Sequence, residues 1–176
     1  RWLFIDFNAY FASCEQQDIP ALRGKPIAVT PTLVDSGCCI AASYPAKRLG
    51  IKTGMRVSEA RQKCPGIVIV QARPPLYVRY HEEILKAVET VTPISVVKSI
   101  DEMSIRLSPS ERVPEVAIAL APALKAVIRE KIGVAITCSI GLSSNDFLAK
   151  FATDMQKPDG LTLLPGGLVP VTTQAA

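Results

Sequence analysis

Short apolar segments alternate with longer amphipathic segments along this chain. Runs rich in β-branched and aromatic side chains predict buried strands at Trp2–Phe7, Pro26–Thr30, Gly37–Ala42, Val68–Gln71, Ile94–Ser99, Met103–Leu107, Val134–Ile140 and Leu161–Leu164. Apolar residues at helical spacing, bounded by Pro and Gly, predict helices over Ala9–Gln17, Pro45–Leu49, Arg56–Lys63, Leu76–Val91, Glu115–Lys131 and Asn145–Met155. The chain therefore mixes strands and helices throughout its length.

The order of these elements predicts an α+β fold. With residues 20–73 set aside, the remainder reads strand, helix, helix, strand, strand, helix, strand, helix, strand. This order is close to a ferredoxin-like split βαβ, an antiparallel or mixed sheet with helices on one face. We therefore expect residues 1–19 and 74–165 to form the larger part, residues 20–73 a small inserted subdomain, and residues 166–176 a tail or linker.

Composition excludes several classes of protein. Of 176 residues, 48% are hydrophobic and the net charge is only +4, which excludes an intrinsically disordered chain. No apolar run reaches the roughly 18–20 residues of a membrane span, so we expect no membrane partner. Five cysteines without a CxxC pair predict reduced thiols and a cytoplasmic protein. Cys14, Cys38, Cys39 and Cys138 are expected in the core, and Cys64, next to Pro65, at the surface.

Basic residues gather in one part of the chain. The segment 42–79 holds eight Lys and Arg residues and one Glu, a charge of +7, which leaves −3 for the remainder. A basic segment beside a mildly acidic one favours a polyanionic partner such as nucleic acid or a nucleotide. A solvated surface rich in Lys and Arg explains the same charge equally well.

Three carboxylates stand beside predicted strands. Asp6 follows an apolar run, and Asp101 and Glu102 lie in the turn between two others. If these strands are neighbours, the carboxylates converge at one sheet edge and suit Mg²⁺, which prefers oxygen ligands. A cyclase, a polymerase and a nuclease all fit such a two-metal site. The alternative is that Asp6 caps the next helix and Asp101 and Glu102 form a polar turn.

Six blocks of sequence follow one another in an order typical of one family. The blocks are Ile5–Glu15, Leu22–Val29, Ser43–Ile51, Ser99–Glu102, Ser139–Gly141 and Phe147–Gly160. Together they resemble the palm and fingers portion of the Y-family, translesion (DinB/UmuC-like) DNA polymerases. No segment resembles the thumb or the little finger of that family, so we expect a palm-and-fingers portion without them.

The resemblance implies a template-directed DNA polymerase that transfers a dNTP to a primer 3′-OH. Two Mg²⁺ ions, for which Mn²⁺ can substitute, would be held by the catalytic Asp6, Asp101 and Glu102 and by the Phe7 carbonyl. The incoming triphosphate would lie on the backbone of Asn8, Ala9, Tyr10 and Phe11, with the Phe11 ring beneath the sugar. Phosphate contacts would come from Tyr44, Lys47 (or Arg48, one position on) and Lys157. Primer–template DNA is the implied partner, and a sliding clamp or other repair proteins would be met through other regions of the family.

The sequence departs from the family pattern at several positions. Asn8 stands where a second aspartate is usual, Ala9 where an aromatic residue or cysteine is usual, and Lys47 where arginine is usual. Met103–Arg106 replaces the usual Ala-Tyr-Leu-Asp. These departures spare the three carboxylates but leave a weakly active or non-catalytic DNA-damage accessory module as an alternative. A two-metal nucleotide cyclase is a further alternative, against which the basic segment argues.

Overall fold

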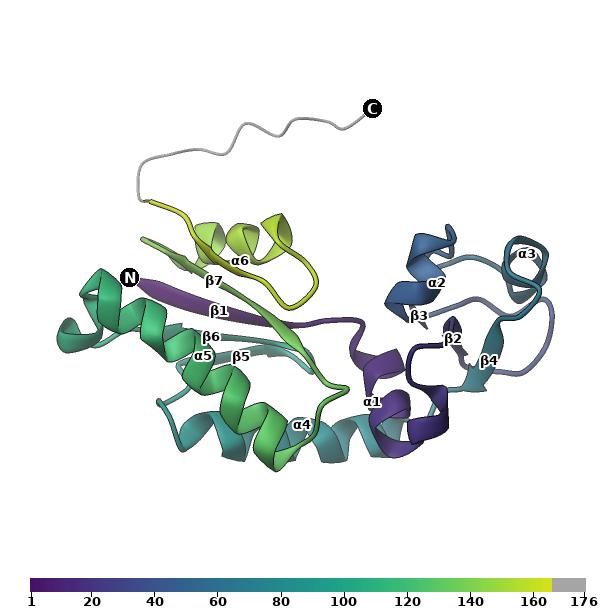
Figure 1. Ribbon diagram of the computed structural model, residues 1–176, viewed down its shortest axis with the longest axis horizontal. Coiled ribbons are helices and arrows are strands. Elements are labelled where there is room, and N and C mark those ends of the chain that lie inside the picture. Colours follow the sequence, from purple (N-terminus) through teal and green to yellow (C-terminus); the bar gives the residue numbers. More distant parts are fainter. Residues whose placement is uncertain (166–176) are drawn as a thin grey trace.

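Two β-sheets, built from different stretches of the chain, form the framework of the protein (Figure 1). The computed structural model describes residues 1–165. The larger sheet has five strands in the order β5-β6-β1-β7-β8, and the smaller has three in the order β3-β2-β4. The predicted tail at 166–176 lies outside the described residues.

The larger sheet is mixed, as predicted. Its strands are β1 (Trp2–Phe7), β5 (Val96–Ser99), β6 (Glu102–Arg106), β7 (Cys138–Ser143) and β8 (Leu161–Leu163). The first strand, β1, lies in the middle and pairs antiparallel with both β6 and β7, whereas β7 and β8 are parallel. The α+β class predicted from the order of elements is confirmed.

Helices cover both faces of this sheet, which corrects the expectation of helices on one face. Helices α4 (Pro74–Glu89) and α5 (Pro114–Lys131) lie on one face, and α6 (Asp146–Met155) lies on the other (Figure 1). The reason lies in β1, where Leu3 and Ile5 belong to the core beneath α4 and α5 while the alternating Phe4 and Asp6 face α6. A strand with buried side chains in both directions needs cover on both sides.

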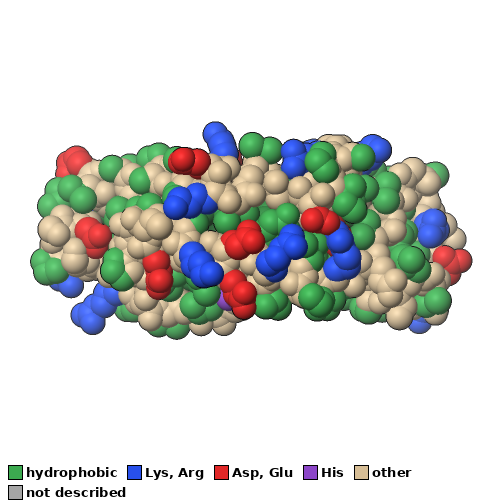
Figure 2. Space-filling model, turned by 90° about the horizontal axis from the view of Figure 1, so that it is seen from below, with side chains coloured by type: hydrophobic (Ala, Val, Ile, Leu, Met, Phe, Trp, Pro, Cys, Tyr) green, Lys and Arg blue, Asp and Glu red, His purple; other side chains and the backbone are tan. Residues whose placement is uncertain are grey.

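The outer surface formed by α4 and α5 carries no extended patch of only positive or only negative side chains. Figure 2 shows acidic and basic side chains intermingled across it. The excess positive charge of segment 42–79 therefore does not form a continuous basic patch on this side of the molecule.

The smaller sheet consists of β2 (Ile27–Thr30), β3 (Ala41–Ala42) and β4 (Val68–Gln71). Helices α2 (Tyr44–Arg48) and α3 (Val57–Lys63) pack on it around a separate small core of mostly Ala, Cys and Ile side chains. Helix α1 (Tyr10–Asp18) lies between this sheet and α4, and short 3-10 helices occur at Pro20–Leu22 and Pro109–Arg112. Strand β2 joins both cores, since Ala28 faces the small core and Val29 the large one.

Two strand predictions and two cysteine predictions need correction. The strand expected at Val134–Ile140 begins only at Cys138 and continues through Gly141 to Ser143, and the strand expected at Gly37–Ala42 is reduced to β3. Cys38 is exposed, because its neighbour Cys39 takes the inward position; Cys64 is buried, because the chain turns inward there from α3 toward β4.

Gly141 permits the close docking of α6. A Cβ atom at this position would lie 2.0 Å from the carbonyl oxygen of Ala149 and 2.9 Å from the Cβ of Ala152. Glycine inside a strand is typical of such a close approach by another backbone.

None of the helices within residues 1–165 is long and apolar enough to cross a membrane.

Candidate active site

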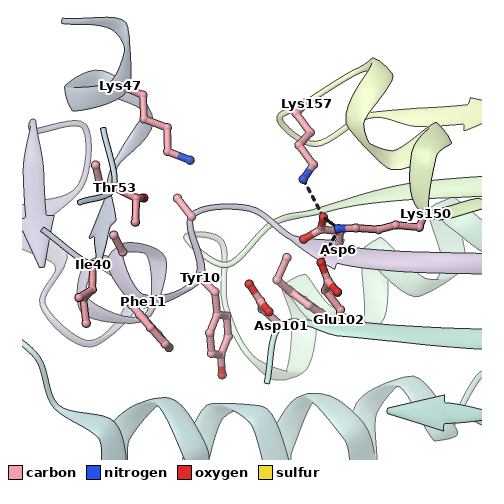
Figure 3. Close-up of a pocket in the computed structure, with 14 residues that line it drawn as sticks. Asp6, Tyr10, Phe11, Ile40, Lys47, Thr53, Asp101, Glu102, Lys150 and Lys157 are labelled. Atoms are coloured by element: carbon pink, nitrogen blue, oxygen red, sulfur yellow. Dashed lines mark hydrogen bonds and ion pairs between the residues drawn. The ribbon is translucent and has the colours of Figure 1, made fainter. Parts of the chain in front are cut away.

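A cavity of about 300 Å³ opens between the edge of the larger sheet and the smaller sheet (Figure 3). It is lined by residues from both sheets and from α1 and α6: Asp6, Phe7, Ala9, Tyr10, Phe11, Ile40, Ala41, Ala42, Lys47, Thr53, Asp101, Glu102, Lys150 and Lys157. Nine of the residues predicted from the sequence as catalytic, metal-binding or nucleotide-binding therefore line one cavity, whereas Asn8, Tyr44 and Arg48 do not line it.

Asp6 and Glu102 form a directly opposed pair on the floor of this cavity. Asp6 ends the buried part of β1 and Glu102 begins β6, and the two are register partners in the antiparallel ladder. Side chains at such opposed positions lie on the same face, with their Cβ atoms about 5 Å apart. Two carboxylates placed so closely repel each other unless cations lie between or beside them.

Two lysines supply the positive charge that this pair requires. The Lys150 ammonium contacts Glu102 Oε1 and lies 2.7 Å from Asp6 Oδ2, while the Lys157 ammonium lies 2.6 Å from the same Asp6 oxygen (Figure 3). Burial alone would lower the pKa of both lysines, but their hydrogen bonds to the carboxylates outweigh it and raise the pKa of each. Both ammonium groups are therefore fully charged at neutral pH.

Asp101 lies at the rim of the cavity, in the turn that precedes β6. Its carbonyl oxygen accepts a hydrogen bond of 2.9 Å from the Phe7 N–H, and its carboxylate accepts one of 2.8 Å from Ser99 Oγ. The preceding residue, Ile100, is hydrogen-bonded through its carbonyl to His81 Nδ1 of α4 at 2.8 Å. The backbone that carries Asp101 is thus fixed, and its side chain lies between those of Tyr10 and Glu102 (Figure 3).

The start of α1 forms the second wall. Ala9 adopts a left-handed backbone conformation, with φ 43° and ψ 53°, which turns the chain sharply from β1 into the helix. Tyr10 is buried and donates a hydrogen bond of 2.6 Å to the Tyr77 carbonyl. The Phe11 ring stacks on the Tyr77 ring with centroids 4.6 Å apart and an angle of 20° between their planes. The helix therefore presents free backbone N–H groups and one aromatic ring to the cavity.

The third wall comes from the smaller sheet and α2. Lys47 reaches the cavity and lies 4.7 Å above the ring of Tyr44, so Tyr44 supports this lysine from outside. Burial, followed by repulsion from Lys157, lowers the pKa of Lys47. Arg48 does not line the cavity, so Lys47 rather than Arg48 is the cation on this wall.

Asn8 serves the framework rather than the cavity surface. Its amide donates to Ser139 Oγ of β7 at 3.0 Å, and its carbonyl accepts from the Asp159 N–H at 2.9 Å. These bonds tie the end of β1 to the loop that carries Lys157. An aspartate at this position would lack the amide group that donates to Ser139. This hydrogen bond explains why asparagine can replace the aspartate that is usual in the family pattern.

The donor set suits a divalent cation, although the carboxylates are not gathered as a finished metal site. Within residues 1–165, no group of three His, Cys, Asp or Glu side chains is arranged to hold a metal ion. Asp6 and Glu102 nevertheless converge on one cation position, now taken by the Lys150 ammonium, and Asp101 lines the same cavity. Carboxylate oxygens are the ligands that Mg²⁺ prefers, so the chemistry of these side chains fits the ion, which would take the position of the Lys150 ammonium.

Sequence reasoning missed five residues that line this cavity, of which two, Thr53 and Lys150, are polar. Thr53 enters it from the turn after α2, and Lys150 enters it from α6. Lys150 carried a signal, because a lysine on the apolar side of a helix requires an acidic partner nearby. Its partners Asp6 and Glu102 are distant in sequence, and only the docking of α6 on β1 and β7 identifies them.

Comparisons with known proteins agree with this geometry. The sequence pattern of the impB/mucB/samB family matches residues 5–154. DNA polymerase IV of Moorella thermoacetica is 42% identical over 170 residues, which are 96% of this chain and 42% of that protein. The crystal structure of DinB from Sulfolobus solfataricus superposes with a TM-score of 0.84 at 34% identity, and an insertion ternary complex of Dbh DNA polymerase with 0.83 at 33%. These structures are matched over 94% and 93% of this chain and 48% of each of theirs.

The chain thus spans less than half the length of the relatives that it matches. The region that matches the family contains the whole smaller sheet, the larger sheet except β8 and the first residues of β1, and every residue that lines the cavity up to Lys150. The resemblance predicted from the six sequence blocks is confirmed, and the chain belongs to the impB/mucB/samB family, that of the Y-family DNA polymerases.

Proposed function

We propose that this chain provides the nucleotidyl-transfer site of a translesion DNA polymerase, with the larger sheet as palm and the smaller sheet as fingers. The observation that carries the proposal is that Asp6, Asp101 and Glu102 line the same cavity as Lys47, Lys157 and the start of α1. Carboxylates on one side and cations with backbone N–H groups on the other suit a metal-bound triphosphate. The reaction joins the primer 3′-oxygen to the α-phosphorus of a dNTP, releases pyrophosphate, and gives up the hydroxyl proton to water.

Each wall of the cavity has a separate task in this reaction. Asp6, Asp101, Glu102 and the Phe7 carbonyl would hold two Mg²⁺ or Mn²⁺ ions. When bound, the ions supply positive charge that stabilises the attacking and leaving oxygens of an in-line displacement. Lys47 and Lys157 attract and orient the phosphates as point charges. The Phe11 ring, held flat against Tyr77, limits the space under the sugar.

The proposed substrate and partner also rest on the matched structures. One of those structures is an insertion ternary complex of a DNA polymerase. A dNTP and primer–template DNA are accordingly the ligands that we propose for this chain. Six of the eight basic residues of segment 42–79 lie between β3 and β4 of the smaller sheet, on one side of the cavity, where they can contribute attraction to phosphates.

Substitution of the carboxylates tests the proposal directly. Asp101→Asn and Asp6→Asn keep the side-chain shape but remove charge from the ion site. We expect each to lower Mg²⁺-dependent dNTP binding, measured by calorimetry on the purified chain, by at least about tenfold. Primer extension, assayed in parallel on undamaged and abasic templates, should fall by orders of magnitude wherever the unsubstituted chain supports it.

Asp35→Asn is the matched control, because Asp35 is 77% exposed, pairs only with Arg61 and lies outside the cavity. It should bind dNTP like the unsubstituted chain. Unchanged Mg²⁺-dependent binding in Asp6→Asn and Asp101→Asn would contradict the assignment. Intact dNTP binding without extension, even when the chain is extended to the full length of its relatives, would favour the non-catalytic accessory module.

A further inference from the structure

The ammonium of Lys150 occupies the position where a cation would bridge Asp6 and Glu102. It contacts the carboxylates of both residues, which are direct partners across β1 and β6 (Figure 3). Lys157 differs from it, because it contacts Asp6 but not Glu102 and is shared with Asp154 on α6. Only Lys150 joins the two opposed carboxylates.

The position of Lys150 is set by the packing of α6. The helix contacts β7 and β1 closely, because Gly141 leaves room for the backbone of Ala149. The Lys150 ammonium also lies 5.4 Å from the centroid of the buried Phe4 ring, on the same face of β1 as Asp6. A cation over an aromatic face is attracted to it. The lysine is therefore held over the carboxylate pair by the fold rather than by chance contact at a surface.

We propose that Lys150 is an internal counter-cation that competes with a divalent metal ion for the bridging position between Asp6 and Glu102, and thereby sets the metal affinity of the site. The proposal rests on the carboxylate site described under the proposed function and adds a role for a residue outside the predicted site. Lys150 is a positioning residue in this account, because it acts through the two carboxylates.

The Lys150 ammonium and a divalent ion compete because both are positively charged and both need the space between Asp6 and Glu102. An ammonium group and a divalent ion cannot lie between the same two oxygens, so the ion binds only when the lysine side chain moves aside. The side chain also lines the open cavity, which gives it room to do so. Without Lys150, Asp6 would keep its contact with Lys157 but Glu102 would lose this ammonium partner, so an ion between the two opposed carboxylates would relieve their repulsion.

Metal binding to the purified chain tests the proposal without any measurement of catalysis. The probe is Mn²⁺, whose free concentration is read by electron paramagnetic resonance. We expect Lys150→Met to bind Mn²⁺ about tenfold more tightly than the unsubstituted chain, from the removal of one unit charge about 4 Å from the ion. Lys150→Arg, which keeps the charge, should bind no more tightly than the unsubstituted chain.

Lys98→Met is the matched control. Lys98 has nearly the same side-chain exposure as Lys150, 36% against 34%, and pairs with Asp146, the first residue of α6, outside the cavity. Its removal takes away the same charge without touching the carboxylate pair, so Mn²⁺ affinity should stay within about twofold of the unsubstituted value.

Thermal unfolding gives a second measurement. In a chelator, Lys150→Met should unfold at a lower temperature than Lys98→Met, and Mn²⁺ should raise its midpoint more than that of the unsubstituted chain. Equal Mn²⁺ affinity of Lys150→Met and the unsubstituted chain would overturn the role of Lys150 while leaving the carboxylate site intact. Absence of any Mn²⁺ binding that depends on Asp6 would overturn both proposals.

Discussion

The guanidinium of Arg73 forms an ion pair with the completely buried carboxylate of Glu15. Its Nε lies 2.9 and 3.1 Å from the two carboxylate oxygens, and its Nη2 lies 2.6 Å from one of them. Arg73 follows β4 of the smaller sheet and precedes α4, whereas Glu15 lies on α1. The Tyr77 hydroxyl also donates to Glu15 at 3.1 Å, and the Tyr77 ring carries Phe11. This ion pair therefore links the end of β4 in the smaller sheet to α1, and through Tyr77 to the Phe11 ring that lines the cavity.

Loss of this arginine should destabilise the protein strongly. Arg73→Met would leave the Glu15 carboxylate buried without a cation, which costs about 3–5 kcal/mol in typical buried pairs. We expect a loss of about 3 kcal/mol in the free energy of unfolding, measured by urea denaturation. Arg79→Met is the control. Arg79 is 58% exposed and its ion pair with Asp18 is long, at 3.8 Å, so its loss should change the free energy of unfolding by less than about 0.5 kcal/mol. Equal effects of the two substitutions would show that Glu15 does not depend on Arg73.

Enlarging Gly141 should separate α6 from the sheet. An added methyl group would meet the Ala149 carbonyl oxygen at 2.0 Å, and this is backbone that cannot rotate away. We expect Gly141→Ala to lower the free energy of unfolding by about 1–3 kcal/mol, and to loosen the contact of Lys150 with Asp6. Gly66→Ala is the matched control, because nothing lies within 4 Å of its added Cβ. Denaturation curves of the two variants that coincide would refute the close docking of α6.

Local sequence pattern predicted the framework well. Every predicted helix of the described residues occurs within about two residues of its expected ends, because Pro, Gly or a polar residue lies near at least one end of each. The strand around Gly141 was misplaced for a physical reason. Glycine usually ends a strand, but here it lies inside β7 because a helix from later in the chain needs the space. Such a requirement cannot be seen in the strand's own sequence.

Truncation of Phe11 should weaken the discrimination between deoxyribose and ribose. The ring is stacked on Tyr77 and lines the cavity beside the carboxylates, so a 2′-hydroxyl would meet it sterically. We expect Phe11→Ala to bring the dissociation constants of dATP and ATP toward equality in Mg²⁺, measured by calorimetry on the purified chain. Phe147→Ala removes an equal ring that is 76% exposed and outside the cavity, and should keep the original ratio. A ratio that does not change in Phe11→Ala would assign this ring to packing alone.

The chain itself should bind a nucleotide more tightly than it binds DNA. The proposed phosphate contacts of the start of α1, Lys47 and Lys157 all line one cavity within the described residues. The chain spans less than half of its relatives, and its +7 segment offers only general attraction to a phosphate backbone. DNA affinity should accordingly be near the roughly 10⁻⁴–10⁻⁶ M of non-specific binding and should fall steeply as salt rises. Fluorescence anisotropy with a labelled primer–template at several salt concentrations measures this. Tight binding that resists salt would show that a complete DNA cleft lies within these residues.

The site was less predictable from sequence than the fold. Asp6, Asp101 and Glu102 could be chosen because a carboxylate beside a buried strand is costly without a partner. The partners themselves could not be chosen, because Lys150 reaches them from a helix that is far away along the chain and on the opposite face from α4 and α5. Asn8 likewise bonds to Ser139 and Asp159, and nothing near it in the sequence indicates those contacts.

The central place of β1 also governs the order in which the protein can assemble. Its six residues leave the ribosome before both of its neighbours, so one edge of β1 waits for β6, complete at residue 106, and the other for β7, complete at residue 143. The smaller sheet needs only residues 27–71 and can form long before. Because contacts between distant parts of a chain form slowly, closure of the larger sheet around β1 should limit the folding rate. The pairing of β1 with β6 brings Asp6 and Glu102 together, and the later pairing with β7 gives α6 the surface from which Lys150 reaches them.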